Sequence, residues 1–367
     1  MRSQRTAPVI GTVTAIQANY YQVQLQGELH QNISQDHNRP IVQLLCTRRS
    51  RLKKVGEQAM VGDQVVVEEP DWLGHRGAIA RILPRQSHLS RPPIANVNQI
   101  LLMFALAEPK IEPQQLTRFL ITAERTHLPI ILCFNKRDLT GYKTQKAWRD
   151  RLQAWGYPPL LISLRTGVGL TVLERSLRYR MTVVAGLSGV GKSSLINHFV
   201  PDVDLRVGQV SRRWGQGRHT TRHVELFELP QGGFLADTPG FNQPNLELFP
   251  TQLGNCFPEI RQRLSQAQCQ FKDCQHMDEP NCAVRGDWER YPIYLSLLAE
   301  VTEQQAKLQM TTMPETRTKR KSRKQGQTQH EPKLETKRYR RPSRRQLQQN
   351  LQTLDWDIDP LEPLSPT

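Results

Sequence analysis

The sequence predicts a multidomain protein, in which an antiparallel β-barrel precedes an α/β domain, a small metal-binding helical domain and a disordered basic tail. Three observations predict this fold class. Short β-rich segments separated by turn signals fill residues 9–90, strands alternate with helices from Ile100 onwards, and cysteines crowd into residues 269–282. We expect the domains to span residues 1–90, 91–248, 249–310 and 311–367.

The composition favours a polyanionic partner. The formal net charge is +16, and such an excess attracts nucleic acid or an anionic membrane surface. The first thirty residues lack an apolar core of signal-peptide length. No apolar run approaches the ~20 residues of a membrane span. We therefore expect a cytoplasmic protein with no membrane partner.

The excess charge is greatest near the C-terminus, where residues 317–345 hold thirteen Lys and Arg against two Glu. Such a block is typical of a disordered basic tail. The tail either binds RNA phosphates without sequence preference or serves only as a solvating extension.

The barrel is predicted from alternating apolar segments between turn signals such as Val61-Gly62-Asp63. A basic loop, Arg48–Lys54, lies between two of these segments. On an oligonucleotide-binding barrel (OB-fold) it would face backbone phosphates, although a solvated loop explains it equally well. Ser90–Pro93 marks the end of the domain. The predicted strands are Val9–Ile16, Tyr20–Leu25, Ile41–Leu45, Gln64–Val67 and Gly77–Ile82.

The α/β domain is predicted to contain a mostly parallel sheet covered on both faces by helices. Leu116, Phe119, Leu120 and Ala123 recur with the spacing of one helix face. Ligands of such sheets bind at the carboxyl ends of the strands. The predicted strands are Ile100–Ala107, Ile130–Phe134, Leu160–Ser163, Met181–Ala185, Val224–Leu229 and Gly233–Asp237.

A phosphate-binding P-loop is predicted between the strand Met181–Ala185 and the helix that follows it. Its glycines allow backbone N–H groups to face an anion, and the helix N-terminus adds its dipole. Lys192 is expected to reach the β- and γ-phosphates, and the Ser193 hydroxyl to ligate Mg²⁺. The motif comprises Gly186, Leu187, Ser188, Gly189, Val190, Gly191, Lys192 and Ser193.

A guanine-reading motif, Asn135-Lys136-Arg137-Asp138, follows the strand Ile130–Phe134. Asp138 would accept from two guanine N–H groups, and Lys136 would pack along the base. Adenine offers no such pair of donors, so the site would discriminate against it. Ser163 would begin a supporting base loop, in which Leu164 stands where Ala is usual.

A third motif, Asp237-Thr238-Pro239-Gly240, has the D-x-x-G form. Asp237 would hold Mg²⁺ through water, and the Gly240 N–H would sense the γ-phosphate. The guanine-reading motif precedes the P-loop by about fifty residues, whereas it follows the P-loop in a conventional GTPase. The sequence therefore predicts a circularly permuted P-loop GTPase domain, an arrangement that neighbouring chain ends tolerate.

A mobile switch loop is predicted at Arg212–His223, with Thr220 or Thr221 closing on Mg²⁺ and the γ-phosphate. Phe241 stands where many GTPases have a glutamine that orients water. We expect slow intrinsic hydrolysis and consider His219 as the assisting group, with a solvated loop histidine as the alternative.

The cysteine cluster consists of Cys269, Cys274, His276 and Cys282. Three thiolates and one imidazole make a closed tetrahedral set for one structural Zn²⁺. Unrelated surface cysteines are the alternative. A helix at 288–308 follows, predicted from the spacing of Leu295, Leu298 and Val301.

The barrel and the order of these motifs closely resemble the bacterial ribosome small-subunit-dependent GTPase A family over about residues 9–305. The resemblance implies a late maturation factor whose GTP hydrolysis the 30S subunit stimulates. It implies GTP or GDP, the 30S ribosomal subunit and 16S rRNA as partners, and we expect a monomer. The resemblance places nucleotide contacts on residues 135–138 and 186–194, the last of which is Ser194. It also places the zinc ligands on the four residues of the cysteine cluster. Leu164 and the tail after Pro314 depart from the family pattern.

Two other functions remain open. The chain could be an RNA-binding chaperone whose nucleotide site is only structural. Four intact motif residues argue against it: Asp138, Lys192, Ser193 and Asp237. It could also be a P-loop kinase or ATPase, which Asp138 disfavours. A nucleotide-indifferent RNA affinity would favour the first, and a preference for ATP the second.

Overall fold

The computed structural model describes residues 9–25, 43–90, 92–200, 224–237, 246, 248–312, 318–322 and 328–332. The chain splits into two compact units, Met1–Thr302 and Glu303–Thr367. Among the described helices, none combines the length and the apolar character that a bilayer span needs.

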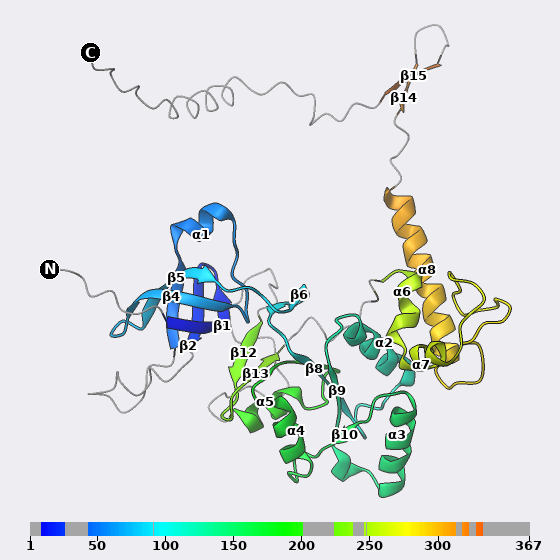
Figure 1. Ribbon diagram of the computed structural model, residues 1–367, viewed down its shortest axis with the longest axis horizontal. Coiled ribbons are helices and arrows are strands. Elements are labelled where there is room, and N and C mark those ends of the chain that lie inside the picture. Colours follow the sequence, from blue (N-terminus) through cyan, green and yellow to red (C-terminus); the bar gives the residue numbers. More distant parts are fainter. Residues whose placement is uncertain are drawn as a thin grey trace, which may run out of the picture. The chain divides into compact units, whose positions relative to one another are not determined.

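The N-terminal strands form a closed five-stranded barrel, drawn in blue in Figure 1. The neighbour order around it is β1-β2-β3-β5-β4. The five predicted strands are confirmed within the described residues, which exclude 41 and 42 of the third, but β3 and β5 pair in parallel. A closed ring with an odd number of strands cannot alternate direction throughout, so one neighbouring pair must be parallel. The bounds are β1 Val9–Gln17, β2 Tyr20–Leu25, β3 Gln43–Arg48, β4 Gln64–Asp71 and β5 Arg76–Ile82.

The basic segment after β3 was predicted as a loop, and this is wrong, because α1 (Ser50–Val55) is a helix. Arg, Lys and Leu are good helix formers. Leu52 is buried and packs into the barrel core with Val65 and Ile79. One apolar anchor therefore fixes the helix to the barrel.

A short hairpin, β6 (His88–Ser90) with β7 (Pro93–Ala95), joins the barrel to the next domain near the predicted boundary. It is tied to the barrel because the Ala95 N–H donates to the Val61 carbonyl at 2.8 Å. The Asn96 side chain also donates to the Gly62 carbonyl at 2.9 Å.

The α/β domain contains a six-stranded sheet in the order β10-β9-β8-β11-β13-β12. Its strand pairs are parallel except for β12 with β13, which form an antiparallel edge. The mostly parallel sheet is therefore confirmed. The bounds are β8 Gln99–Ala105, β9 Ile130–Asn135, β10 Leu160–Leu161, β11 Met181–Gly186, β12 Glu225–Glu228 and β13 Phe234–Asp237.

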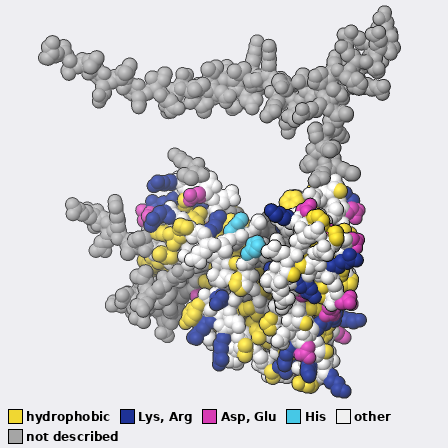
Figure 2. Space-filling view, turned by 45° about the vertical axis from the view of Figure 1, so that its right-hand side comes forward, with side chains coloured by type: hydrophobic (Ala, Val, Ile, Leu, Met, Phe, Trp, Pro, Cys, Tyr) yellow, Lys and Arg dark blue, Asp and Glu magenta, His cyan; other side chains and the backbone are white. Residues whose placement is uncertain are grey.

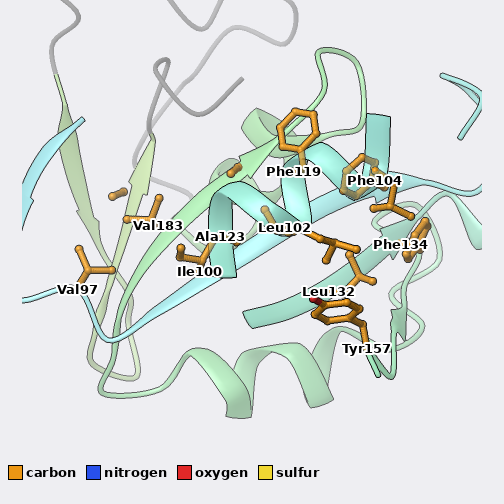
Figure 3. Close-up of a cluster of buried hydrophobic side chains, with 14 of the residues drawn as sticks. Val97, Ile100, Leu102, Phe104, Phe119, Ala123, Leu132, Phe134, Tyr157 and Val183 are labelled. Carbon is orange, nitrogen blue, oxygen red and sulfur yellow. The ribbon is translucent and has the colours of Figure 1, made fainter. Parts of the chain in front are cut away.

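Helices pack on both faces of this sheet. Every residue of the central strand β8 is buried. Ile100, Leu102 and Phe104 share a core with α2 (Pro113–Glu124) and α3 (Tyr142–Ala154). Figure 3 shows Phe119 of α2 beside Phe104, and their ring centroids lie 5.4 Å apart. The alternate side chains of β8 pack instead with α4 (Leu170–Leu177) and α5 (Lys192–Phe199).

The segment after the α/β domain is helical and has its own core around Phe257, Trp288 and Leu298. Ile121 of α2 belongs to the same core, so this module packs on the α/β domain. Its helices are α6 Pro250–Leu253, the 3₁₀ turn η4 Gly254–Cys256, α7 Pro258–Gln266 and α8 Tyr291–Thr312.

Two short strands occur within the basic tail. They are β14 (Thr318–Ser322) and β15 (Thr328–Pro332), which pair antiparallel. An isolated two-stranded ribbon is marginally stable in water.

On the face seen in Figure 2, Lys and Arg side chains are spread over the barrel and the α/β domain.

Candidate functional site

Three motifs that are distant in sequence meet at one edge of the sheet. β9 ends at Asn135, β11 at Gly186 and β13 at Asp237. Because β9, β11 and β13 run in the same direction within the sheet, their carboxyl ends lie at the same edge. The predicted nucleotide motifs are therefore brought together.

The loop between β11 and α5 has the backbone that a phosphate cradle needs. Gly186, Gly189 and Gly191 have φ angles of 141°, 80° and 106°, which L side chains rarely adopt. A Cβ on Gly186 would lie 2.0 Å from the Met103 carbonyl oxygen of β8. Glycine is thus required both for the turn and for its close packing on the sheet.

Lys192 begins α5 and is buried, and Ser193 beside it is buried as well. The Lys192 ammonium donates to the carbonyls of Gly186 at 2.8 Å and Leu187 at 2.7 Å. Burial lowers the pKa of Lys192, and the nearby Asp237 carboxylate opposes that shift. The P-loop thus holds a cation and a hydroxyl beside a carboxylate, the groups that bind a polyphosphate with Mg²⁺.

Asn135 connects the P-loop to the predicted base loop. Its side-chain nitrogen donates to the Val190 carbonyl at 2.9 Å, and its oxygen accepts from the Leu164 N–H at 3.2 Å. Asn135 is only 4% exposed, so these bonds are shielded from water. The side chain therefore fixes the predicted phosphate-binding and base-binding loops relative to each other.

Asp138 is held by the predicted supporting loop. The Ser163 hydroxyl donates to the Asp138 carboxylate at 2.7 Å and accepts from the Thr166 N–H at 3.1 Å. The hydrogen bond from Ser163 lowers the pKa of Asp138, although slight desolvation opposes it. The exposed carboxylate is therefore ionised at neutral pH and acts only as an acceptor, as recognition of paired N–H donors requires.

The other two residues of this motif hold the backbone in place. Lys136 adopts a left-handed conformation with φ of 61°, and its ammonium donates to the Glu108 carbonyl. The Arg137 N–H donates to the Ile162 carbonyl at 3.2 Å. Sequence reasoning missed Glu108 and Val190 as partners, because both act through backbone carbonyls, which any residue type supplies.

Part of the predicted catalytic set lies outside the described residues. Asp237 is buried at the end of β13, next to Val184 of β11. His219, Thr220, Thr221 and Gly240 fall in segments that the structure does not describe.

The predicted metal ligands converge. The Nδ1 atom of His276 lies 3.6, 3.5 and 3.5 Å from the Sγ atoms of Cys269, Cys274 and Cys282. All four ligand atoms lie within 4.8 Å of one another. A tetrahedron with metal–sulfur bonds of about 2.3 Å and a metal–nitrogen bond of about 2.0 Å has sulfur–nitrogen edges of about 3.5 Å. The four residues therefore fit a tetrahedral metal ion.

Tyrosine hydroxyls hold the backbone of the predicted metal-binding loop in place. The Tyr294 hydroxyl donates to the Gln275 carbonyl at 2.6 Å, and the Tyr291 hydroxyl donates to the His276 carbonyl at 3.0 Å.

Burial raises the pKa of the Cys274 thiol to about 12. Without a cation the thiol would stay protonated at neutral pH, so metal binding and deprotonation are coupled.

An arginine with no exposed surface joins the C-terminal module to the α/β domain. Arg290 forms a two-point ion pair with Glu259, with its Nε 2.7 Å from Oε1. Its guanidinium carbon lies 4.8 Å from the ring centroid of Trp155 and 4.9 Å from that of Phe257. Trp155 follows α3, whereas Phe257 belongs to the C-terminal module, so Arg290 packs between the two.

Replacing Gly191 by alanine tests the contact between the P-loop and Asn135. A Cβ there would lie 2.6 Å from the Asn135 side-chain nitrogen, at a φ of 106°. We expect GTP affinity to fall on the order of 10-fold, the equivalent of about 1–3 kcal/mol of strain. Equilibrium binding of a fluorescent GTP analogue measures it. Gly141→Ala is the control, because its φ is −73° and its Cβ meets nothing within 4 Å. Equal affinities of the two variants would contradict the expected clash.

The chain is similar to known proteins of one GTPase family. Residues 82–247 match the family model of the RsgA GTPase. A "Small ribosomal subunit biogenesis GTPase RsgA" of Trichormus variabilis is 54% identical over 365 residues, which cover 96% of this chain and 99% of that protein.

Two solved structures are also similar, each at 28% identity. YjeQ from Thermotoga maritima aligns with a TM-score of 0.63, over 81% of this chain and 99% of that one. YloQ, described as a circularly permuted GTPase, aligns with a TM-score of 0.64, over 83% of this chain and 98% of that one.

Proposed function

The chain belongs to the RsgA GTPase family, and we propose that it hydrolyses GTP in the biogenesis of the small ribosomal subunit. The observation that carries this function is the hydrogen-bonded path across the site. Asp138 accepts from Ser163, while Asn135 bonds both the adjoining Leu164 and Val190 of the P-loop. A site that couples a base-reading carboxylate to a phosphate cradle fits a guanine nucleotide.

The nucleotide contacts are proposed from the motifs together with this geometry. Asp138 would read the guanine base, Lys192 would bind the β- and γ-phosphates, and Ser193 with Asp237 would hold Mg²⁺. For the hydrolytic step we retain His219, Thr220, Thr221 and Gly240, all outside the described residues. The full proposed nucleotide set is Asn135, Lys136, Arg137, Asp138, Ser163 and Gly186 through Ser194.

The C-terminal metal is proposed to be one structural Zn²⁺. Three thiolates with one imidazole are soft and borderline ligands that select zinc, and a set of four leaves no open position for catalysis. Separate buried clusters in the barrel and around Phe257 support distinct barrel and C-terminal domains, and we propose the boundaries 1–90, 91–248, 249–310 and 311–367.

We further propose that the chain acts as a cytoplasmic monomer and binds the 30S subunit through 16S rRNA. The name of the Trichormus relative supports the subunit as partner. The net charge of +16 supports RNA as the contacted component.

GTP turnover by the purified chain tests the function. It is measured alone and with small subunits, large subunits or bare RNA at matched ionic strength, and Lys192→Ala supplies the baseline. Stimulation by small subunits alone is the expected result. If no addition stimulates turnover and RNA affinity is equal with GDP and GTP, the chain is an RNA-binding chaperone. A preference for ATP would instead indicate a P-loop ATPase.

Replacing Cys282 by serine is expected to remove the metal and to unfold the C-terminal module at a lower temperature. The reason is that structural zinc sites contribute their binding energy directly to folding. Elemental analysis of the purified chain, with thermal unfolding, measures both effects. Cys256→Ser is the control for metal content, because Cys256 lies in the same module but outside the four-residue cluster. A full metal complement in Cys282→Ser would contradict the ligand assignment.

A further inference from the structure

The turn that joins α4 to β11 carries an exposed aromatic residue, Tyr179. Tyr179 is 74% exposed, yet its φ is 56°, a conformation uncommon for a bulky residue. Its N–H donates to the Gly232 carbonyl at 2.9 Å, and the Arg180 N–H donates to the Leu177 carbonyl at 3.2 Å. The Arg180 carbonyl in turn accepts from the Phe234 N–H at 2.9 Å. The backbone around Tyr179 is thus bonded on both sides.

The ring of Tyr179 is also held in place. A Cβ on Gly232 would lie 2.6 Å from a ring carbon, so the ring rests against that glycine. The Arg178 guanidinium carbon lies 5.2 Å from the ring centroid. The position of the ring is therefore set by its neighbours, although most of its surface faces solvent.

A polar cleft of about 270 Å³ opens beside this ring. Gln64 of the barrel, Gln86 and Asn98 of the linker, and Arg180 line it together with Tyr179. The Asn98 oxygen accepts from the Met181 N–H at 2.7 Å. No Asp or Glu is among the lining residues of the described chain. The cleft thus combines amide groups, an aromatic face and positive charge.

Neither arginine of the turn is neutralised by a carboxylate of the described residues. Arg178 and Arg180 are exposed, and neither has an ion-pair partner among the residues that the structure describes. An acidic peptide would use these charges and could hydrogen-bond the amides, but most of its side chains have no planar face to stack on the ring. A nucleotide uses all three, because its base has a π-face and a hydrogen-bonding edge and its phosphate is anionic.

We propose that this cleft binds one unpaired nucleotide of ribosomal RNA, with its base stacked on Tyr179. The amides of Gln64, Gln86 and Asn98 face the edge of the base, and Arg178 with Arg180 contact flanking phosphates. The barrel and the α/β domain then hold the same nucleotide. This site deepens the proposed function and depends on it, because it names the RNA element that the factor reads.

The test compares Tyr179→Ala, Tyr179→Phe and Arg180→Gln with wild type in the full chain. Tyr142→Ala is the matched control, because Tyr142 is also 74% exposed on the α/β domain. Binding to a single-stranded RNA oligonucleotide and to an RNA duplex is measured by fluorescence anisotropy over a range of salt concentrations. Thermal unfolding confirms that each variant is folded.

Tyr179→Ala is expected to weaken single-strand binding by about 10-fold, while Tyr179→Phe and Tyr142→Ala bind as wild type. Arg180→Gln is expected to reduce the slope of log affinity against log salt by about 0.7, because one phosphate contact is lost. A folded Tyr179→Ala chain with wild-type affinity would overturn the proposal. The proposal would also be overturned if Tyr179→Ala lost the same affinity for single strand and duplex, or if Tyr179→Ala and Tyr142→Ala lost the same affinity. Either result would indicate general surface contact or a protein-binding face.

GTP turnover separates this result from the proposed function. A wild-type chain with no subunit-stimulated turnover would refute the proposed function, whatever the Tyr179 variants bind. Normal turnover combined with unchanged RNA binding by Tyr179→Ala would refute only the stacking site.

Discussion

Replacing Asp138 by asparagine is expected to weaken GTP binding on the order of 100-fold and to create an affinity for xanthine nucleotides. Asparagine puts an N–H donor where the carboxylate has an acceptor, and this donor faces the N–H groups of guanine. Xanthine has a carbonyl in place of the guanine amino group, so it suits the new donor. The change in preference follows from hydrogen-bond polarity, because the two side chains have the same shape.

Displacement of a bound fluorescent guanine nucleotide by GTP, XTP or ATP measures the nucleotide preference of Asp138→Asn. Ser163→Ala is the comparison, because it removes the hydroxyl that donates to Asp138 at 2.7 Å and leaves the carboxylate intact. That variant should bind GTP more weakly without gaining XTP. Unchanged GTP affinity in Asp138→Asn would show that the carboxylate does not read the base.

Replacing Arg290 by alanine is expected to lower the free energy of unfolding by about 3–5 kcal/mol. Arg290 has no exposed surface, and Glu259, its partner, is 6% exposed, so the variant leaves a carboxylate buried without its cation. The stacking of the guanidinium on Trp155 and Phe257 is lost as well.

Urea denaturation followed by circular dichroism measures the loss. Arg285→Ala is the control, because Arg285 pairs with Asp278 at 3.7 Å on the surface and such pairs contribute at most about 1 kcal/mol. A double variant, Arg290→Met with Glu259→Leu, should recover part of the loss, because it removes both charges. If Arg290→Ala costs no more than Arg285→Ala, the buried pair does not hold the module in place.

Sequence reasoning was most successful where chemistry is local. Each nucleotide motif sits at the end of a strand whose apolar run could be recognised, so the edge of the sheet where they meet was predictable. The metal ligands fall within a short segment and could also be recognised. In contrast, Trp155, Glu259 and Arg290 are far apart in the chain, and nothing local to any of them indicates that they meet.

Leu164 shows a different limit. Its side chain departs from the family pattern, in which Ala is usual at this position of the base loop. In the structure, the group used at this position is the backbone N–H of Leu164, which donates to Asn135. Every residue except proline has this donor. The departure in residue type therefore leaves that hydrogen bond intact.

The helix α1 was not predicted, because one buried leucine among basic residues gives no clear helical periodicity.

The packing of Arg290 has a thermodynamic consequence for nucleotide binding. Trp155, whose ring it contacts, belongs to the same buried cluster as Phe134 of β9, the strand that ends at Asn135. A continuous path of packed side chains therefore connects the C-terminal module to the predicted base-reading motif. Suppose that a guanine nucleotide raises, through this path, the affinity of the module for a partner by some factor. Equilibrium linkage then requires that the partner raise nucleotide affinity by the same factor.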